Sequence, residues 1–146
     1  MDFSNSPLSK RPKKKKARKT RIKARSASRK TEADKLWAEL IKLRAGGKCE
    51  YTGKTDNLHA HHLAGKSTYR LRYDLDNGMC LNGGIHKFVA HRQDRQHIFR
   101  HFVKRVRGAD IFENLEMLRR YRTKSDLGMI ILWLKGKIAL FNEGNF

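Results

Sequence analysis

The first strongly periodic stretch of the chain lies between positions 31 and 47. It predicts a helix that begins near Thr31 and ends at Gly46-Gly47. Thr31 and Asp34, three residues apart, resemble a capping box with Asp in place of Glu or Gln, which supports this start. The apolar positions with helical spacing are Leu36, Trp37, Leu40, Ile41 and Leu43.

The C-terminal third of the chain has three more helical patterns. They predict helices over 94–107, over 110–121 and from Ser125, as an N-cap, to about Phe141. Aromatic side chains fall at core spacing here and in the preceding segment, and none forms the aromatic strand typical of RNA-reading domains. The residues expected in the core are Phe88, Phe99, Phe102, Phe112, Trp133 and Phe141.

Between these helical regions the pattern changes to short extended segments. Residues 48–52 and 58–63 are each predicted as a strand, and 74–78 as a turn. Residues 86–91 lie at the start of another expected helix. The combination predicts an α+β protein.

Charge is distributed unevenly along the 146 residues, whose formal net charge is +20. Residues 1–31 contain 13 Lys and Arg and a single acid, Asp2. We expect residues 1–30 to be a disordered basic arm that neutralises phosphates, because such a segment repels itself and has little apolar surface to bury. The remaining 31–146 is expected to be one folded domain, and the excess charge indicates a polyanionic partner, nucleic acid before membrane.

Cysteine content and hydropathy indicate the compartment. Cys49 and Cys80 are too few for a disulfide framework, and two free thiols in a reducing cytosol are expected. No apolar run reaches the ~18 residues of a membrane span, and the N-terminus lacks a secretory signal pattern. We therefore expect an intracellular protein with no membrane partner, and the sequence leaves its oligomeric state open.

Five of the seven histidines lie between positions 59 and 91. A His-Ala-His-His strand followed by a His-x4-His segment has the elements of a metal site for Zn, Ni or another divalent ion. His61 and His62 are adjacent on the predicted strand and point to opposite faces, so one could bind metal while the other acts as a base. The five residues are His59, His61, His62, His86 and His91.

The order of these residues resembles the HNH endonuclease family, over residues 48–92. His62 is followed after 15 residues by Asn77, and Asn77 after 9 residues by His86. The segment Leu71-Arg-Tyr-Asp-Leu-Asp-Asn77 and the C-terminal helices look most like phage HNH proteins, including recombination nucleases of the NinG/Rap type. The resemblance implies a ββα-metal (HNH) motif with core 48–92, embedded in a helical frame that includes C-terminal helices over 94–141.

The resemblance also implies a role for each residue. His62 is the general base that activates water, and Asn77 holds that base in orientation. His61, His86 and His91 bind one divalent ion, Mg, Mn, Zn or Ni, which binds the scissile phosphate and stabilises the transition state. His59 is a further metal or phosphate contact.

Three features depart from the family pattern. Ala60 stands where an acidic residue often precedes the first metal-binding histidine, and His59 could substitute for it. Thr52, Asn82 and Ile85 stand where cysteines would complete a structural zinc site, so a four-cysteine site is excluded. His91 follows His86 by five residues, and ligands five apart do not share one face of a regular α-helix.

The basic residues around the motif are expected to hold DNA through its backbone. The candidate contacts are Lys66, Arg70, Arg72 and Lys87. The sequence thus predicts a metal-dependent DNA endonuclease with little sequence specificity, acting on phage recombination or branched intermediates in the cytoplasm of a bacterial host. Two alternatives stay open: a sequence-specific homing or restriction-type HNH enzyme, and a non-catalytic basic DNA-binding protein with a structural metal site.

Overall fold

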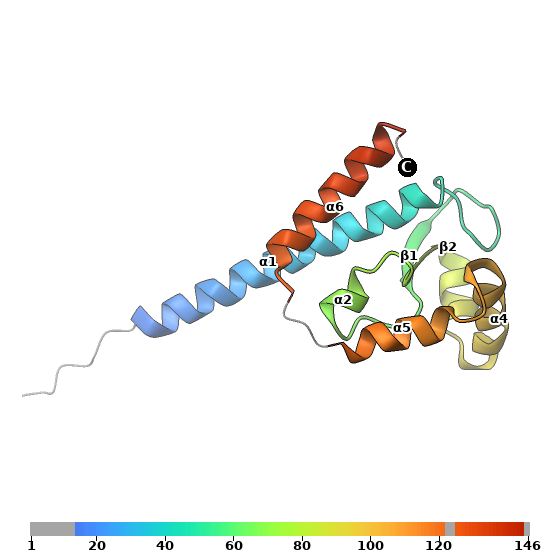
Figure 1. Cartoon of the computed structure of the whole chain (residues 1–146), viewed down its shortest axis with the longest axis horizontal. Helices are drawn as coiled ribbons and strands as arrows, with labels where there is room; N and C mark the ends of the chain where they lie inside the picture. The colour runs from blue at the N-terminus through green and yellow to red at the C-terminus, as the bar shows by residue number, and fades with distance from the viewer. Residues whose placement is uncertain (1–13, 122–124, 145–146) are drawn as a thin grey trace, which may run out of the picture.

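The computed structural model describes residues 14–121 and 125–144, with side chains from Lys19 onward, and has a mixed α+β architecture (Figure 1). A small antiparallel sheet lies between helices on both sides. In chain order the elements are α1 (Lys14–Arg44), β1 (Leu58–His62), α2 (Tyr69–Arg72), β2 (Gly78–Asn82), α3 (Gly83–Ile85), the π-helical turn η1 (His86–Ala90), the 3₁₀ turn η2 (Gln93–Arg95), α4 (Gln96–Arg107), α5 (Ile111–Arg120) and α6 (Leu127–Asn142).

Helix α1 begins much earlier than the sequence pattern indicated. The Thr31 hydroxyl does not cap a helix start but donates to the carbonyl oxygen of Ala27, 3.1 Å away, inside a continuous helix. Residues 14–30 are therefore helical, and the expectation of disorder is wrong for them; residues 1–13 lie outside the described part. The segment has no Gly or Pro and is rich in Lys, Arg and Ala, which are good helix formers.

The two halves of α1 have different surroundings. Residues 19–32 are all exposed, and this half extends away from the rest of the molecule (Figure 1). From Ala33 onward one face is buried, at Ala33, Trp37, Leu40 and Ile41. The buried half packs against α6, which lies alongside it.

The sheet consists of β1 and β2 alone, paired antiparallel with His61 opposite Met79 and Ala60 opposite Cys80. The strand predicted at 48–52 is wrong, because this segment forms tight turns in which Cys49 N–H donates to the carbonyl oxygen of Lys54, 2.7 Å away. Strand β2, whose first four residues are all buried, was not predicted from the sequence. A short apolar run enclosed on both sides carries no alternation to mark it as a strand.

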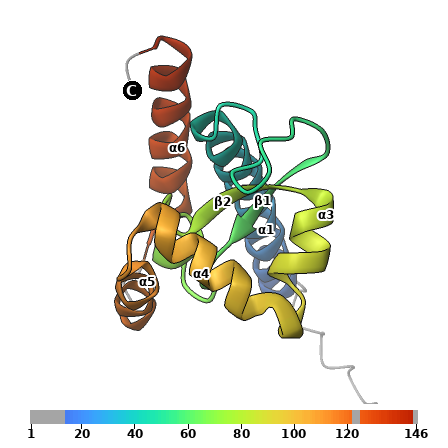
Figure 2. The same cartoon turned by 90° about the vertical axis from the view of Figure 1, so that its right-hand side faces the viewer.

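The hairpin separates two hydrophobic clusters. One cluster joins α1 and α6 to Tyr73 and Cys80. The other joins Met79 and Leu81 to the buried faces of α4 and α5. Figure 2 shows α4 and α5 on the side of the hairpin away from α1. The hairpin is thus held on one face by α1 and on the other by the α4–α5 pair.

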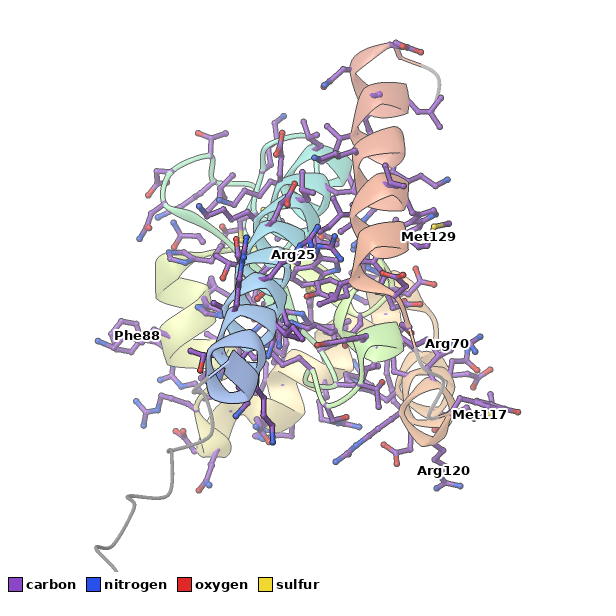
Figure 3. The ribbon with its side chains drawn as sticks, turned by 90° about the vertical axis from the view of Figure 1, so that its left-hand side faces the viewer. Arg25, Arg70, Phe88, Met117, Arg120 and Met129 are labelled. Atoms are coloured by element: carbon purple, nitrogen blue, oxygen red, sulfur yellow. The ribbon has the colours of Figure 1, made fainter. Side chains whose placement is uncertain are left out.

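The three C-terminal helices form close to their predicted positions. The N-cap of α6 is Asp126, whose carboxylate accepts from Gly128 N–H at 2.7 Å, and not Ser125. Phe99 and Phe112 are buried as expected, whereas Phe88 is 51 % exposed and points away from the molecule (Figure 3), and Trp133 is 44 % exposed.

Both cysteines are free thiols, as expected, and both are buried. Within residues 14–121 and 125–144, no helix has the length and apolar character needed to cross a membrane.

Candidate metal and catalytic site

His61 is positioned by its place in strand β1. It is 7 % exposed, and its ring meets the ring of buried Phe99 edge-on, with centroids 5.5 Å apart. Its neighbour His62 stacks instead on Trp37 of α1. The two adjacent histidines therefore face opposite sides of the hairpin, as strand alternation predicts.

A local change of helix type brings His86 and His91 together. The Asn82 side chain accepts from Gly84 N–H at 2.9 Å and begins the short helix α3, which passes directly into the π-helical turn His86–Ala90. A π-helix contains more residues per turn than the 3.6 of an α-helix, so a five-residue spacing returns towards the same face. The Nε2 atoms of His86 and His91 lie 3.2 Å apart.

His61, His86 and His91 form a cluster whose candidate ligand atoms all lie within 4.8 Å of one another. Two nitrogens bound to one tetrahedral zinc are roughly 3.3 Å apart. The 3.2 Å separation between His86 and His91 matches this geometry. The cluster can therefore hold a metal ion, and it contains all three ligands that the sequence predicted.

The electrostatics of the cluster favour neutral rings. Burial, reinforced by the nearby imidazoles of His86, His91 and His62, lowers the pKa of His61 to about 3. Burial and the neighbouring His91 also lower the pKa of His86. Because a metal binds the neutral imidazole, the lowered pKa values of His61 and His86 favour the form in which one nitrogen of each ring can bind a metal.

His62 is held by two contacts that leave one ring nitrogen available. Its ring stacks on Trp37 with centroids 3.9 Å apart and an interplanar angle of 13°. Nε2 lies 2.9 Å from the carbonyl oxygen of Arg72, and since a carbonyl only accepts, Nε2 carries the proton. Nδ1 is therefore the atom able to accept a proton. Burial lowers the pKa of His62, although the Arg72 carbonyl opposes the shift.

Asn77 organises the loop that follows β1. Its side-chain oxygen accepts from Ala64 N–H, and its amide nitrogen donates to the carbonyl oxygens of Gly65 and Leu71, each at 2.8 Å. Both amide donors are thus used within the segment between β1 and β2, one on the loop and one on α2. The Arg72 carbonyl and Trp37 contact the His62 ring itself, whereas Asn77 binds the backbone next to Arg72 through the Leu71 carbonyl. That Asn77 helps to orient the base stays a prediction, with this backbone contact as the indirect route.

His59 lies beside the cluster without joining it. Its ring is stacked against the ring of His86 with centroids 5.4 Å apart, and its Nε2 donates to the Asn57 side-chain oxygen at 2.9 Å. The three-histidine group does not include it.

The predicted DNA contacts fall into two groups. Lys66, Arg70 and Lys87 are exposed, and Arg70 lies over the Tyr121 ring, on the side of the molecule visible in Figure 3. Arg72 is instead engaged by Asp34, through two contacts of 2.6 Å. This pair raises the pKa of Arg72 and fixes the residue whose carbonyl binds His62. Arg72 therefore has a structural role, and its phosphate contact stays a prediction.

A small pocket of about 170 Å³ brings the two sides of the site together. It is lined by His61, His62 and His91, and by side chains of α4 and α5 that the sequence analysis did not assign to the site. The unassigned polar ones are Gln96 and Arg100, which the four-residue helical spacing places on one face of α4. Only the fold shows that this face meets the histidines.

Comparison of the chain with protein-family models, with curated proteins and with solved structures finds no match. The site is therefore interpreted from its own geometry.

Proposed function

We propose that this protein is a metal-dependent endonuclease that hydrolyses DNA phosphodiester bonds by an HNH-type mechanism. The observation that carries the proposal is a single pocket lined by the available base His62 and by two members of the three-histidine cluster. A hydrolase needs a proton acceptor beside a group that stabilises the negative charge of the transition state. The resemblance of residues 48–92 to HNH nucleases supports the same interpretation.

His61, His86 and His91 would hold the metal. Three imidazole nitrogens suit Zn or Ni better than Mg or Mn, which prefer oxygen ligands. When bound, the ion would act as a Lewis acid towards a phosphate oxygen. The described residues place no carboxylate or thiol in this cluster.

His62 would accept the proton from the attacking water through Nδ1. The lowered pKa keeps its ring neutral at physiological pH, so the base form is present without a preceding deprotonation. Stacking on Trp37 and the bond from Nε2 to the Arg72 carbonyl hold the ring in one orientation. The Asp34–Arg72 pair and Asn77 fix the backbone on which that orientation depends.

The charge distribution supports a DNA backbone as the partner. Lys66 and Arg70 are exposed in the segment between β1 and β2, and Lys87 is exposed next to His86. The exposed half of α1 adds a further basic surface. Contacts of this kind bind phosphates without reading sequence and weaken strongly with salt. Branched or single-stranded recombination intermediates are the substrates suggested by the phage-type segment 71–77.

The test is cleavage of linear duplex, single-stranded and four-way-junction DNA by metal-stripped protein refilled with Mg, Mn, Ni or Zn. We expect cutting only after metal is restored, and its loss in the His62→Ala variant. A preference for the junction would indicate a recombination enzyme, whereas one defined cut on plasmid DNA would indicate a homing or restriction-type enzyme. Tight DNA binding without cutting in any metal would overturn the proposal in favour of a binding protein with a structural metal.

A further inference from the structure

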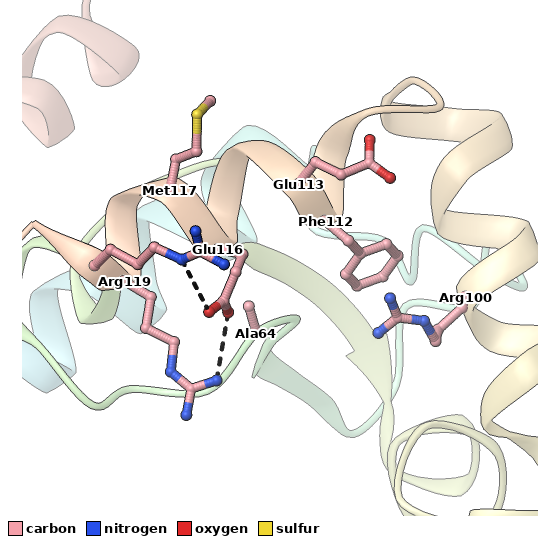
Figure 4. Close-up of a pocket in the computed structure, with 8 residues that line it drawn as sticks. Ala64, Arg100, Phe112, Glu113, Glu116, Met117 and Arg119 are labelled. Carbon is pink, nitrogen blue, oxygen red and sulfur yellow. Dashed lines mark hydrogen bonds and ion pairs between the residues drawn. The ribbon is translucent and has the colours of Figure 1, made fainter.

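A second, larger pocket adjoins the histidine pocket. It has a volume of about 630 Å³ and lies between α4, α5 and the loop after β1 (Figure 4). Arg100 and Phe112 line both pockets, so the two spaces meet at these side chains. The other residues of the larger pocket are Ala64, Glu113, Glu116, Met117, Arg119 and Arg120.

The guanidinium group of Arg100 is held in a defined orientation. Its central carbon lies 3.8 Å from the centroid of the Phe112 ring, and Phe112 is buried. An arginine stacked on an aromatic face keeps the N–H groups at its edge free for an anion.

The acidic residues of this pocket are engaged by other cations. Glu116 pairs with Arg119 at 3.4 Å and with Arg120 at 3.8 Å, as the dashed lines in Figure 4 show. Glu113 lies 3.9 Å from the Lys104 ammonium group. Among the described residues, no carboxylate forms an ion pair with Arg100. Arg100 is thus a positioned cation beside the histidine cluster with its anion-binding edge available.

We propose that Arg100 binds the phosphodiester that is presented to the histidine cluster, and that the larger pocket receives the nucleotide on one side of it. This inference rests on the proposed nuclease function and adds to it a substrate-binding residue outside the HNH-like segment 48–92. A guanidinium group can hold two non-bridging phosphate oxygens at once, which fixes the orientation of the phosphate. A volume of about 630 Å³ lies within the range of pockets that enclose small organic ligands.

The chain offers a matched control on the same helix. Arg105 is also exposed, and its guanidinium carbon also lies over an aromatic ring, that of Phe102, at 5.7 Å. It lines neither of the two pockets. Arg100→Ala and Arg105→Ala therefore each remove one positive charge that lies over an aromatic ring, and they differ in whether the arginine lines the two pockets.

The first measurement is binding of inorganic phosphate to Co²⁺-loaded protein, followed by the absorption spectrum of the bound Co²⁺. We expect Arg100→Ala to weaken phosphate binding by about tenfold or more, from the loss of charge-assisted hydrogen bonds. Arg100→Lys should have an intermediate phosphate affinity, because lysine retains the charge but lacks the planar guanidinium group that donates two hydrogen bonds at once. The phosphate affinity of Arg105→Ala should stay within about twofold of the wild type. Equal Co²⁺ affinity and equal urea midpoints in all variants would show that the metal site and fold are intact.

The second measurement is the cleavage rate at saturating DNA, which we expect to fall in Arg100→Ala and not in Arg105→Ala. Absence of phosphate binding to the wild type, or equal phosphate affinity in the two alanine variants, would overturn the role of Arg100. Phosphate binding that depends on Arg100 in a protein that cuts no DNA would overturn the nuclease proposal and leave the anion site standing. A wild type that cuts DNA, with Arg100→Ala unchanged in both measurements, would overturn only the inference.

Discussion

Ala60 and His62 face α1 from one side of the β1–β2 hairpin, whereas His59 and His61 face the π-helical turn from the other. The α1 side is closely packed, since a Cβ atom added at Gly78 would lie 2.2 Å from Cδ1 of Ile41. On the opposite side, imidazole rings meet edge-on and turn nitrogen atoms towards one another. The face towards α1 thus anchors the hairpin, and the opposite face presents the candidate metal ligands. Strand alternation gives the adjacent residues His61 and His62 these different surroundings.

The largest expected effects come from removing one histidine on each face. His61→Ala should abolish tight metal binding, because it leaves two ligands of three. His62→Ala should leave metal affinity within about threefold yet lower the cleavage rate by about 10²–10⁴, the usual contribution of a general base. Calorimetric metal titration together with single-turnover cleavage measures both quantities.

A parallel loss of metal affinity in the two variants would contradict this separation. It would mean that both histidines serve one ligand set and that the faces are not functionally distinct. His101→Ala, which removes an exposed histidine on α4, is the control for loss of an imidazole elsewhere.

The sequence predicted the candidate ligands and strand β1, which carries His61, better than it predicted β2, the strand that pairs with β1. His61, His86 and His91 were recognised by residue type and order, and the structure brings them together. Their geometry was not predictable, because the five-residue spacing suits a π-helical turn and no local sequence signal distinguishes that turn from an α-helix. The structural role of Arg72 was not predictable for a related reason: its partner Asp34 lies 38 residues away, and only the tertiary fold pairs them.

The packing of the α1 face is tested by the Gly78→Ala substitution. The added methyl group would also meet the Trp37 ring at 2.9 Å, so we expect the free energy of unfolding to fall by about 1–3 kcal/mol. Because Trp37 supports His62, cleavage should fall more than metal affinity. Urea denaturation with metal titration measures the difference.

Gly136→Ala is the matched control. Its Cβ would meet no atom within 4 Å, and Gly136 lies on the exposed side of α6. Alanine there should stabilise the protein by up to about 1 kcal/mol through helix propensity. Equal destabilisation by the two substitutions would show that the α1 face is not closely packed.

The ligand face should make the metal-free protein sensitive to acid. The pKa of His61 is lowered to about 3 from an ordinary value of 6.5, so below pH 6.5 the unfolded chain binds a proton that the folded chain does not. The contribution of His61 to the free energy of unfolding is therefore fully present above pH 6.5 and is lost as the pH decreases towards 3. Between pH 7 and pH 5 the expected loss is about 2 kcal/mol. Urea midpoints of metal-free protein test this, and His61→Gln should flatten the profile; an unchanged profile in that variant would assign the acid sensitivity to other groups.

The smallest effect on stability is expected from a substitution in the exposed half of α1, which packs against neither face of the hairpin. A helix was not predicted there, because the local charge and lack of apolar residues favoured disorder, whereas Lys, Arg and Ala propensity favours the helix that forms. Ala24→Pro should reduce the far-ultraviolet helical signal but change the free energy of unfolding by less than about 0.5 kcal/mol, since residues 19–32 are exposed.

Ala38→Pro is the counterpart in the packed half, where Ala38 contacts the cluster that supports the hairpin, and it should destabilise the protein by about 3 kcal/mol or more. If Ala24→Pro left the helical signal unchanged, residues 19–30 would not be helical in solution. If it instead lowered the urea midpoint as much as Ala38→Pro, the exposed half of α1 would be an integral part of the fold, and the folded domain would begin before residue 19.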